Sequence, residues 1–99
     1  MKLSIVIVSY NVKDYIKQCI RSILRSNLPE SLFEIIIIDN DSYDGTVQDI
    51  KKSFDNIYII ENKVNEGFSK AVNKGIKKAN GDFICLLNPD VIISENTFS

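Results

Sequence analysis

The stretch LSIVIVSYN, residues 3–11, indicates how this chain folds. Its first part, residues 3–8, is an apolar run that only Ser4 interrupts, and its last part, residues 9–11, is polar. A short apolar run without alternation is typical of a strand buried on both faces, and such strands belong to parallel sheets that helices cover. We therefore predict a strand over residues 3–8 whose carboxyl end presents polar side chains.

Working outward from this strand, the hydrophobic pattern predicts three more strands and three helices. The other predicted strands cover residues 33–38, 57–60 and 83–87. We expect Asn11 to cap the first helix and Asp44 the second. The predicted inward faces are Tyr15, Ile16, Cys19, Ile20, Ile23 and Leu24 in the first helix, Val47, Ile50 and Phe54 in the second, and Phe68, Ala71, Val72, Ile76 and Ala79 in the third, over residues 68–79. Close packing against the sheet explains Gly75 within the third helix.

Strands that alternate with helices predict a parallel sheet with helices on both faces. Crossovers between parallel strands are right-handed, so the chain must return to the other side of the first strand to cover both faces. We predict an α/β protein: a three-layer α/β/α sandwich, Rossmann-like, with a mainly parallel sheet in the strand order 3-2-1-4. At 99 residues it forms one domain.

Polar residues follow each predicted strand. In an open α/β sheet, ligands bind outside the carboxyl ends of the strands, at the point where the strand order reverses. An aromatic ring, two carboxylates and several amides at that edge suit a nucleotide, through its base, its ribose and its diphosphate. The candidate substrate-binding residues are Ser9, Tyr10, Asn11, Asp39, Asp41, Asn65, Gly67, Asn88 and Asp90.

The first loop, SYNVKDY over residues 9–15, contains no glycine. A dinucleotide-binding domain places GxGxxG there so that the backbone can approach a pyrophosphate, so phosphates must be neutralised differently here. Asp90 offers a hard carboxylate oxygen, which suits Mg²⁺ or Mn²⁺ bridging phosphate oxygens. We therefore predict Asp90 as a metal ligand.

Composition excludes several other functions. The chain has no histidine, which excludes Ser-His-Asp and Cys-His catalysis and histidine-ligated zinc. Its net charge of −1 argues against nucleic-acid binding. Cys19 and Cys85 lie in apolar patterns and are interpreted as buried free thiols of a reducing compartment. No run approaches the about 20 apolar residues that span a bilayer, so we expect a soluble, cytoplasmic protein.

Four motifs together resemble the nucleotide-binding half of a family 2 glycosyltransferase: SIVIVSYN, IIDNDSYDGT, NEGFSKAVNKGIKKANGDF and LLNPDV, in this order and spacing. The resemblance covers essentially the whole chain. It implies the glycosyltransferase A-type fold and an inverting transfer of sugar from a nucleotide diphosphate sugar to an acceptor. The last motif contains Asn-Pro-Asp at residues 88–90, and in this it resembles rhamnosyltransferase-like members and related enzymes of polysaccharide assembly.

The resemblance also implies roles for particular residues. Residues 9–11 match the segment that borders the base, and Asp39 matches an aspartate that hydrogen-bonds it. Residues 88–90 match the DxD motif, with Asp90 as the ligand of the metal and diphosphate. Asn88 departs from the motif, because it keeps a carbonyl for a ribose hydroxyl but loses a charge.

No residue of this chain matches the family's catalytic carboxylate, which comes from the second half along with the acceptor site. The final residues, SENTFS over 94–99, are interpreted as the first turn of a helix cut short. We therefore expect a C-terminally truncated, donor-binding fragment that is inactive alone. The acceptor of the whole enzyme would be a saccharide or a lipid-linked molecule, which allows contact with the inner membrane surface.

Simpler interpretations stand beside these roles. Residues 88–90, Asn-Pro-Asp, favour a turn whether or not they bind a ligand, and Tyr10 can simply cover the sheet edge. Asn65 and Gly67 fit a loop that needs positive φ. The lysines of the third predicted helix fit a solvated face. The alternatives to a glycosyltransferase are a non-catalytic α/β module that binds a nucleotide or a protein, a nucleotidyltransferase without its Gly-rich loop, and a receiver domain without its acidic pair.

The fourth predicted strand ends the sheet. Its apolar residues Phe83, Ile84, Leu86 and Leu87 would lie on an exposed edge, which is a template for pairing with another chain. We therefore predict self-association through this edge or the tail.

Overall fold

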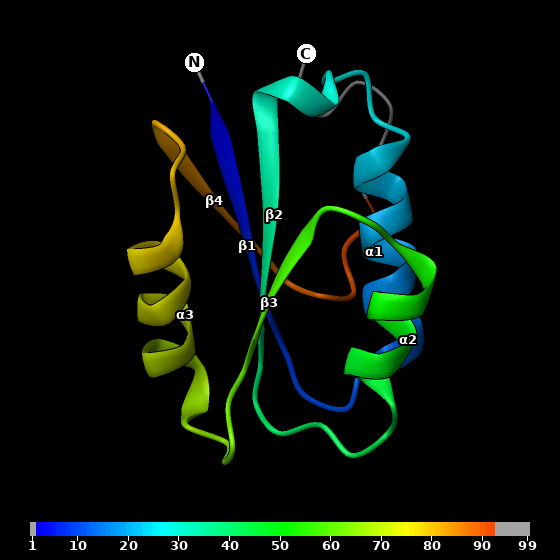
Figure 1. Cartoon of the computed structure of the whole chain (residues 1–99), viewed down its shortest axis with the longest axis vertical. Helices are drawn as coiled ribbons and strands as arrows, with labels where there is room; N and C mark the ends of the chain where they lie inside the picture. The colour runs from blue at the N-terminus through cyan, green and yellow to red at the C-terminus, as the bar shows by residue number, and fades with distance from the viewer. Residues whose placement is uncertain (1, 93–99) are drawn as a thin grey trace.

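A computed structural model describes residues 2–92 of the chain, which form four strands, three α-helices and one short 3-10 turn (Figure 1). The order of elements confirms the predicted alternation. Their bounds are β1 Leu3–Ser9, α1 Lys13–Leu24, η1 Glu30–Leu32, β2 Phe33–Asp39, α2 Thr46–Ser53, β3 Ile57–Glu61, α3 Gly67–Lys78 and β4 Phe83–Leu87.

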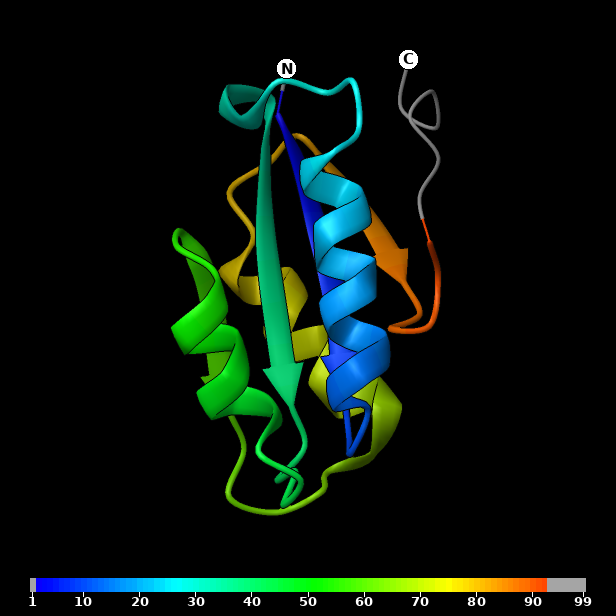
Figure 2. The same ribbon diagram turned by 90° about the vertical axis from the view of Figure 1, so that its right-hand side faces the viewer.

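The sheet has the predicted order β3-β2-β1-β4, and every pairing is parallel. Helices α1 and α2 cover one face of the sheet and α3 covers the other, which makes three layers (Figure 1 and Figure 2). The register places Ser9 beside Asp39, and Asp39 beside Glu61. The polar residues after β1 and β2 therefore emerge together at one edge of the sheet.

Alternate residues of the central strands fill two separate cores. Because successive strand side chains point to opposite faces, Ile5 and Ile7 pack toward α1 whereas Val6 packs toward α3. The α1 side is the larger core and includes the buried residues Ile16, Cys19, Ile20 and Ile23 of α1. Burial on both faces explains why β1 and β2 show no alternation of polar and apolar residues.

Gly75 lets α3 approach the sheet closely, as predicted. A Cβ atom at this position would lie 2.5 Å from Val6 Cγ1 and 2.7 Å from Ile38 Cδ1. This contact fixes the rotation of the helix, so Ala71, Val72 and Gly75 face inward. The prediction that Phe68 and Ile76 also face inward is wrong, because both are exposed at the margins of that narrow face.

The predicted helix caps are also corrected. Asn11 adopts a left-handed φ of 51°, and α1 begins two residues later, after Val12, without a side-chain cap. The N-cap of α2 is Gly45 rather than Asp44. On α1 the predicted inward face is too broad, since Tyr15 and Leu24 are exposed.

Strand β4 pairs with β1 alone and forms an open edge among the described residues. Phe83, Ile84 and Leu86 are exposed, as predicted, but Leu87 is half-buried against the α1 side core. Cys19 and Cys85 are free thiols, buried and half-buried respectively. The predicted helical turn over 94–99 lies outside the described residues. Within residues 2–92, every helix is too short or too polar to cross a membrane.

Candidate functional site

The carboxylate of Asp39 is the centre of a buried polar cluster at the carboxyl ends of β1 and β2. It is 3% exposed. The Ser9 hydroxyl donates to Asp39 Oδ1 at 2.7 Å, and the Ser42 hydroxyl donates to the same oxygen at 2.6 Å. The Ser42 N–H donates to Asp39 Oδ2 at 2.8 Å. The charge is thus satisfied by fixed donors, which shape the turn after β2.

Asn11, in the loop after β1, forms two hydrogen bonds with this turn. Its backbone N–H donates to the Ser42 hydroxyl at 2.9 Å, and its side-chain Oδ1 accepts from the Tyr43 N–H at 2.9 Å. These two bonds use the left-handed conformation of Asn11, which Asn tolerates better than most residues. The loops after β1 and β2 are therefore joined into one unit.

Asp44 extends the same unit to the starts of two helices. It accepts from the Lys13 N–H at the start of α1 and from the Thr46 N–H and hydroxyl at the start of α2. Burial would raise the pKa of Asp44, but these hydrogen bonds, led by that from Thr46, hold the pKa below its ordinary value. Asp44 therefore has a structural role, which agrees with leaving it out of the predicted site.

Two tyrosine rings lie on the outer surface of this joined loop. Tyr10 and Tyr43 meet edge to face, with ring centroids 6.3 Å apart and planes at 79°. Tyr10 is 44% exposed and Tyr43 is 83% exposed. The nearby Tyr43 raises the pKa of Tyr10, and the carboxylate of Asp41 adds to this effect. Asp41 is itself exposed, with a left-handed φ of 65°.

Asn40 ties the β3–α3 loop to the end of β2. Its Nδ2 donates to the Gly67 carbonyl at 3.1 Å, while its Oδ1 accepts from Asn62 Nδ2 at 2.8 Å and from the Glu66 N–H at 3.3 Å. Asn40 and Asn62 are both buried. Within the loop, Asn65 Oδ1 accepts from the Gly67 N–H, and Gly67 has a φ of 82° that favours glycine.

Residues 88–91 form a turn at the end of β4. The Val91 N–H donates to the Asn88 carbonyl at 3.1 Å, and the Cys19 thiol approaches the same oxygen at 3.9 Å. Burial, then Asp90 and Cys85, raises the pKa of Cys19 to about 11. This turn therefore sits against α1, with Asn88 and Asp90 exposed.

The predicted site residues thus form separate groups. Ser9, Asn11 and Asp39 meet through Ser42, with Tyr10 and Asp41 on the same loops. Asn65 and Gly67 join through Asn40. None of the hydrogen bonds among residues 2–92 connects Asn88 or Asp90 to either group.

Asp90 has the chemistry for a divalent cation but supplies one carboxylate. Among the described residues, no three acidic or cysteine side chains gather to hold a metal ion. Mg²⁺ is often bound by one or two carboxylates together with substrate phosphates, rather than by an all-protein cage. An exposed carboxylate on a turn, without an ion pair to any other residue of 2–92, therefore fits a metal that arrives with a diphosphate.

Asn40, Ser42 and Tyr43 are not among the predicted site residues, although Asn40 lies between Asp39 and Asp41 at the end of the second predicted strand. All three lie in the segment DNDSYDGT, from which only Asp39 and Asp41 are assigned to the site. The signal that could have found them is the density of short polar side chains there, since Asn and Ser commonly bond neighbouring backbone.

Comparison with known proteins gives a consistent picture. Residues 4–99 match the sequence family described as glycosyl transferase family 2. The chain is 37% identical over 94 residues to the poly(ribitol-phosphate) beta-glucosyltransferase of Bacillus spizizenii, an alignment that covers 91% of this chain and 15% of that protein. The chain therefore spans a small part of the length of this relative.

Solved structures agree in fold. A crystal structure of Staphylococcus aureus TarS, residues 1–349, in complex with UDP matches with a TM-score of 0.90 and 29% identity, covering 98% of this chain and 30% of that one. The mannosyltransferase PcManGT from Pyrobaculum calidifontis, in complex with GDP-Man and Mn²⁺, matches with a TM-score of 0.83 over 90% of this chain and 27% of that one. Its identity is 20%, so this second likeness concerns the fold alone.

Proposed function

Because the chain belongs to glycosyl transferase family 2, we propose that it is the donor-binding part of a glycosyltransferase and binds a nucleotide diphosphate sugar at the carboxyl ends of β1 and β2. Transfer to an acceptor is then the activity of the longer protein. We expect the 99-residue chain alone to be inactive, because no residue in it matches the catalytic carboxylate of the family.

The joined loop around Asp39 carries this proposal. Tyr10 and Tyr43 are two exposed rings on loops that follow the same strand ends as the buried carboxylate of Asp39, and the backbone of Tyr43 is fixed by its hydrogen bond to Asn11. Exposed rings on a fixed loop suit stacking on a base, which is worth about 1–3 kcal/mol per base. Asp39 Oδ2 accepts only one of the bonds described, so it retains a lone pair for an N–H on the edge of the base.

We propose a uridine nucleotide as the donor, since TarS structures with UDP and with UDP-GlcNAc both match this chain. The names of the relatives support an acceptor of the phosphate-polymer class, such as poly(ribitol phosphate), either as a free saccharide polymer or linked to a lipid. Inverting stereochemistry and transfer of a hexosyl or rhamnosyl group remain proposals from the family resemblance, as does a cytoplasmic location at the inner membrane surface.

We assign Asp90 as the ligand of Mg²⁺ or Mn²⁺ in a DxD-like motif with Asn88. The support is chemical: Asp90 is an exposed carboxylate at the end of the strand beside β1. When bound, the cation would neutralise charge on the diphosphate. Residues 88–91 would hold Asp90 at this edge through the Asn88–Val91 turn.

Calorimetric titration of UDP, dTDP and GDP into the chain, with and without Mn²⁺, tests donor binding and metal use together. We expect UDP to bind, Mn²⁺ to strengthen binding, and Asp90→Ala to remove only the metal-dependent part. Asp82→Ala, an exposed carboxylate at the opposite end of β4, is the matched control. Failure of all three nucleotides to bind would contradict donor binding and favour the alternative of a non-catalytic α/β module that binds a protein.

Self-association is a further proposal, supported by the exposed apolar side chains of β4. Phe83→Lys and Leu86→Lys should each shift the chain toward a monomer in sedimentation analysis, because a charged edge resists strand pairing. A wild-type chain that stays monomeric at high concentration would contradict this proposal.

A further inference from the structure

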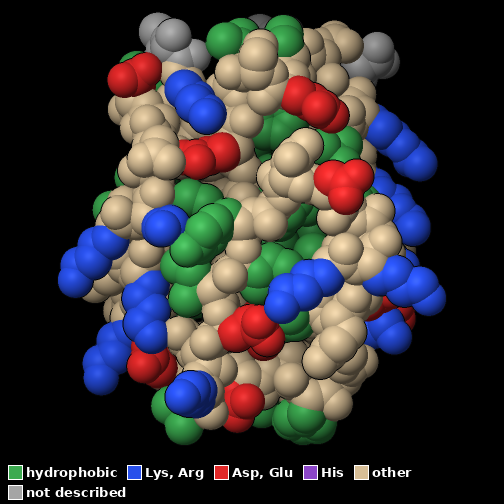
Figure 3. All heavy atoms as spheres, in the orientation of Figure 1, with side chains coloured by type: hydrophobic (Ala, Val, Ile, Leu, Met, Phe, Trp, Pro, Cys, Tyr) green, Lys and Arg blue, Asp and Glu red, His purple; other side chains and the backbone are tan. Residues whose placement is uncertain are grey.

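A hollow of about 620 Å³ runs between the edge strand β3 and helix α3. It extends from Tyr58, on the strand, to Glu66, in the loop that leads into α3 at the carboxyl ends of the strands. Figure 3 shows lysine side chains gathered on the α3 flank beside apolar side chains in this region. We name it the β3–α3 groove, lined by Tyr58, Ile60, Asn62, Lys63, Lys74, Lys77, Lys78 and neighbouring residues.

The β3–α3 groove carries unbalanced positive charge. Its two carboxylates are already ion-paired: Glu66 with Lys74 at 2.6 Å and Glu61 with Lys51 at 3.0 Å. Among residues 2–92, the other three lysines of the groove have no carboxylate within ion-pair distance; they are Lys63, Lys77 and Lys78. The whole chain has a net charge of −1, so this excess of positive charge is local.

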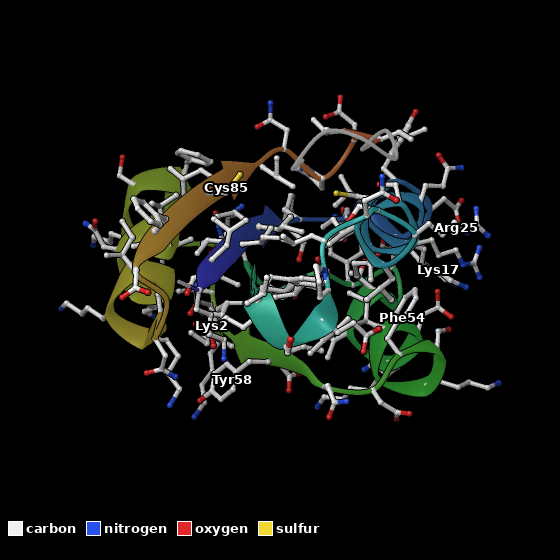
Figure 4. All side chains as sticks on the ribbon, turned by 90° about the horizontal axis from the view of Figure 1, so that it is seen from above. Lys2, Lys17, Arg25, Phe54, Tyr58 and Cys85 are labelled. Carbon is white, nitrogen blue, oxygen red and sulfur yellow. The ribbon has the colours of Figure 1, made fainter. Side chains whose placement is uncertain are left out.

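Two other residues that line the groove, Tyr58 and Asn62, are held in place by neighbouring side chains. Tyr58 pairs with Ile36 in the sheet, so its ring lies on the α3 face, as Figure 4 shows. Lys78 Nζ stands 4.5 Å from the centroid of that ring. Asn62 is 6% exposed and is held by Asn40 on one side and by Lys74 Nζ, at 2.6 Å, on the other. The groove thus combines an aromatic ring with lysine ammonium groups. This combination suits an anionic ligand that also has apolar C–H groups to pack against the ring.

We propose that the β3–α3 groove binds phosphates of an anionic acceptor polymer away from its reacting end, whose own site the family resemblance places in the second half of the enzyme. This assignment rests on the acceptor class proposed above and adds the surface that would hold it. The groove ends at the loop of residues 65–67, which Asn40 ties to the donor site. A polymer lying in it would therefore pass along the molecule toward the carboxyl ends of the strands.

A phosphate polymer fits better than a membrane surface. The lysines line a hollow beside an edge strand, together with a buried amide and an aromatic ring. A flat lipid surface would need cations on a convex face, whereas a chain of separated phosphates and polyol units can enter a groove. Lysine ammonium groups are compact charges that suit phosphate.

The test measures binding of a fluorescein-labelled ribitol phosphate oligomer by anisotropy over a range of salt concentrations. The groove variant is Lys63→Gln/Lys77→Gln/Lys78→Gln. The matched control removes the same charge from exposed positions on α1 and α2, as Arg21→Gln/Arg25→Gln/Lys52→Gln. Figure 4 shows Arg25 on the side of the molecule away from Tyr58.

We expect the groove variant to bind the oligomer at least about tenfold more weakly. We also expect it to lower the slope of log Kd against log salt by about 2, on the scale of about 0.7 per phosphate contact for single-stranded nucleic acids. The control should change little. Equal weakening in both variants, or wild-type binding to anionic phosphatidylglycerol vesicles but not to the oligomer, would overturn the assignment. UDP titration of the same proteins separates the two proposals. If the wild type does not bind UDP, the result contradicts the donor site but not the assignment of the groove.

Discussion

The two ends of the proposed donor site are built very differently. At the ends of β1 and β2, Asp39 is buried, and its hydrogen bonds connect two loops before any ligand is present. At the end of β4, Asp90 stands exposed on a turn that contacts α1 and the core beneath it. Both regions follow parallel neighbouring strands, yet one is preorganised and the other is a single carboxylate.

This difference suits the two ends to different parts of a nucleotide. Preorganised groups lose little entropy on binding, so the Asp39 end suits the rigid base of a nucleotide. The diphosphate is charged and flexible, and a hydrated cation can join it to one exposed carboxylate. The comparison predicts that loss of a buried hydrogen-bonding group at the first end affects both stability and binding, whereas loss of an exposed side chain at either end affects binding alone.

Asp39→Ala should have the largest effect. It would leave one buried hydroxyl, one half-buried hydroxyl and one backbone N–H without an acceptor, and each such loss costs about 1–3 kcal/mol. We expect the free energy of unfolding in urea to fall by at least about 3 kcal/mol. Asp55→Ala, at an exposed position after α2, should stay within about 0.5 kcal/mol of the wild type. Equal stability of the two variants would contradict the central role of Asp39.

Ser42→Ala should come next. Its hydroxyl donates to Asp39 and accepts from the Asn11 N–H, so its removal opens the joint between the two loops. We expect a loss of about 1–2 kcal/mol in the same urea experiment. Ser53→Ala, on the exposed last turn of α2, is the matched control. An unchanged midpoint for Ser42→Ala would mean that the loops are held together by other contacts.

Tyr43→Ala should affect binding without affecting stability. The ring is largely exposed, so unfolding should change by less than about 0.5 kcal/mol. Loss of a stacking surface should weaken UDP binding about tenfold, within the range for one base–aromatic contact. Tyr43→Phe should restore most of the affinity, and Tyr15→Ala, an exposed tyrosine on α1, should bind UDP normally. Full affinity in Tyr43→Ala would exclude the ring from the base site.

The last effect concerns the thiol beneath the β4 turn and appears only at high pH. Burial and Asp90 raise the pKa of Cys19 to about 11 from an ordinary value of 9.0. The folded chain therefore keeps a proton that the unfolded chain releases, so this contribution to stability is complete below about pH 9 and is lost as the pH rises toward 11. Unfolding midpoints measured from pH 7 to 11 should fall over this window, and Cys19→Ala should flatten the fall.

Asp90→Asn sharpens this last test. Removal of the charge should lower the pKa of Cys19 slightly, which thiolate absorbance near 240 nm can follow during titration. An unchanged Cys19 titration in Asp90→Asn would place the β4 turn farther from α1 than described here.

The fold could be predicted from the sequence because its signals are local and strong. The apolar runs at residues 3–8 and 33–38 required a covered parallel sheet, and right-handed crossovers then left few strand orders. The errors lie where tertiary contact overrides local pattern. The tight contact of Gly75 with Val6 rotates α3, so Phe68 points outward although it falls at the helical period.

The site could be predicted only in part. Strand-end logic predicted that Ser9, Asn11 and Asp39 lie together, and the structure confirms this placement, because parallel register brings the strand ends together. Their role in binding a ligand stays a prediction. Strand-end logic did not assign Ser42 or Asn40, whose hydrogen bonds join segments about 30 residues apart. The sequence of a turn does not indicate which distant residue its side chains will bond. Asn11 was also assigned to a helix cap, because the same residue type serves both capping and left-handed turns.

The most direct test of nucleotide binding at the Asp39 end is titration of the isotopically labelled chain with UDP and Mg²⁺, followed by amide chemical shifts. We predict that the largest changes occur at Tyr10, Asn11 and residues 39–43, with smaller changes at the β4 turn only when Mg²⁺ is present. Changes confined to the β3–α3 groove, or none at saturating UDP, would contradict a donor site at the ends of β1 and β2.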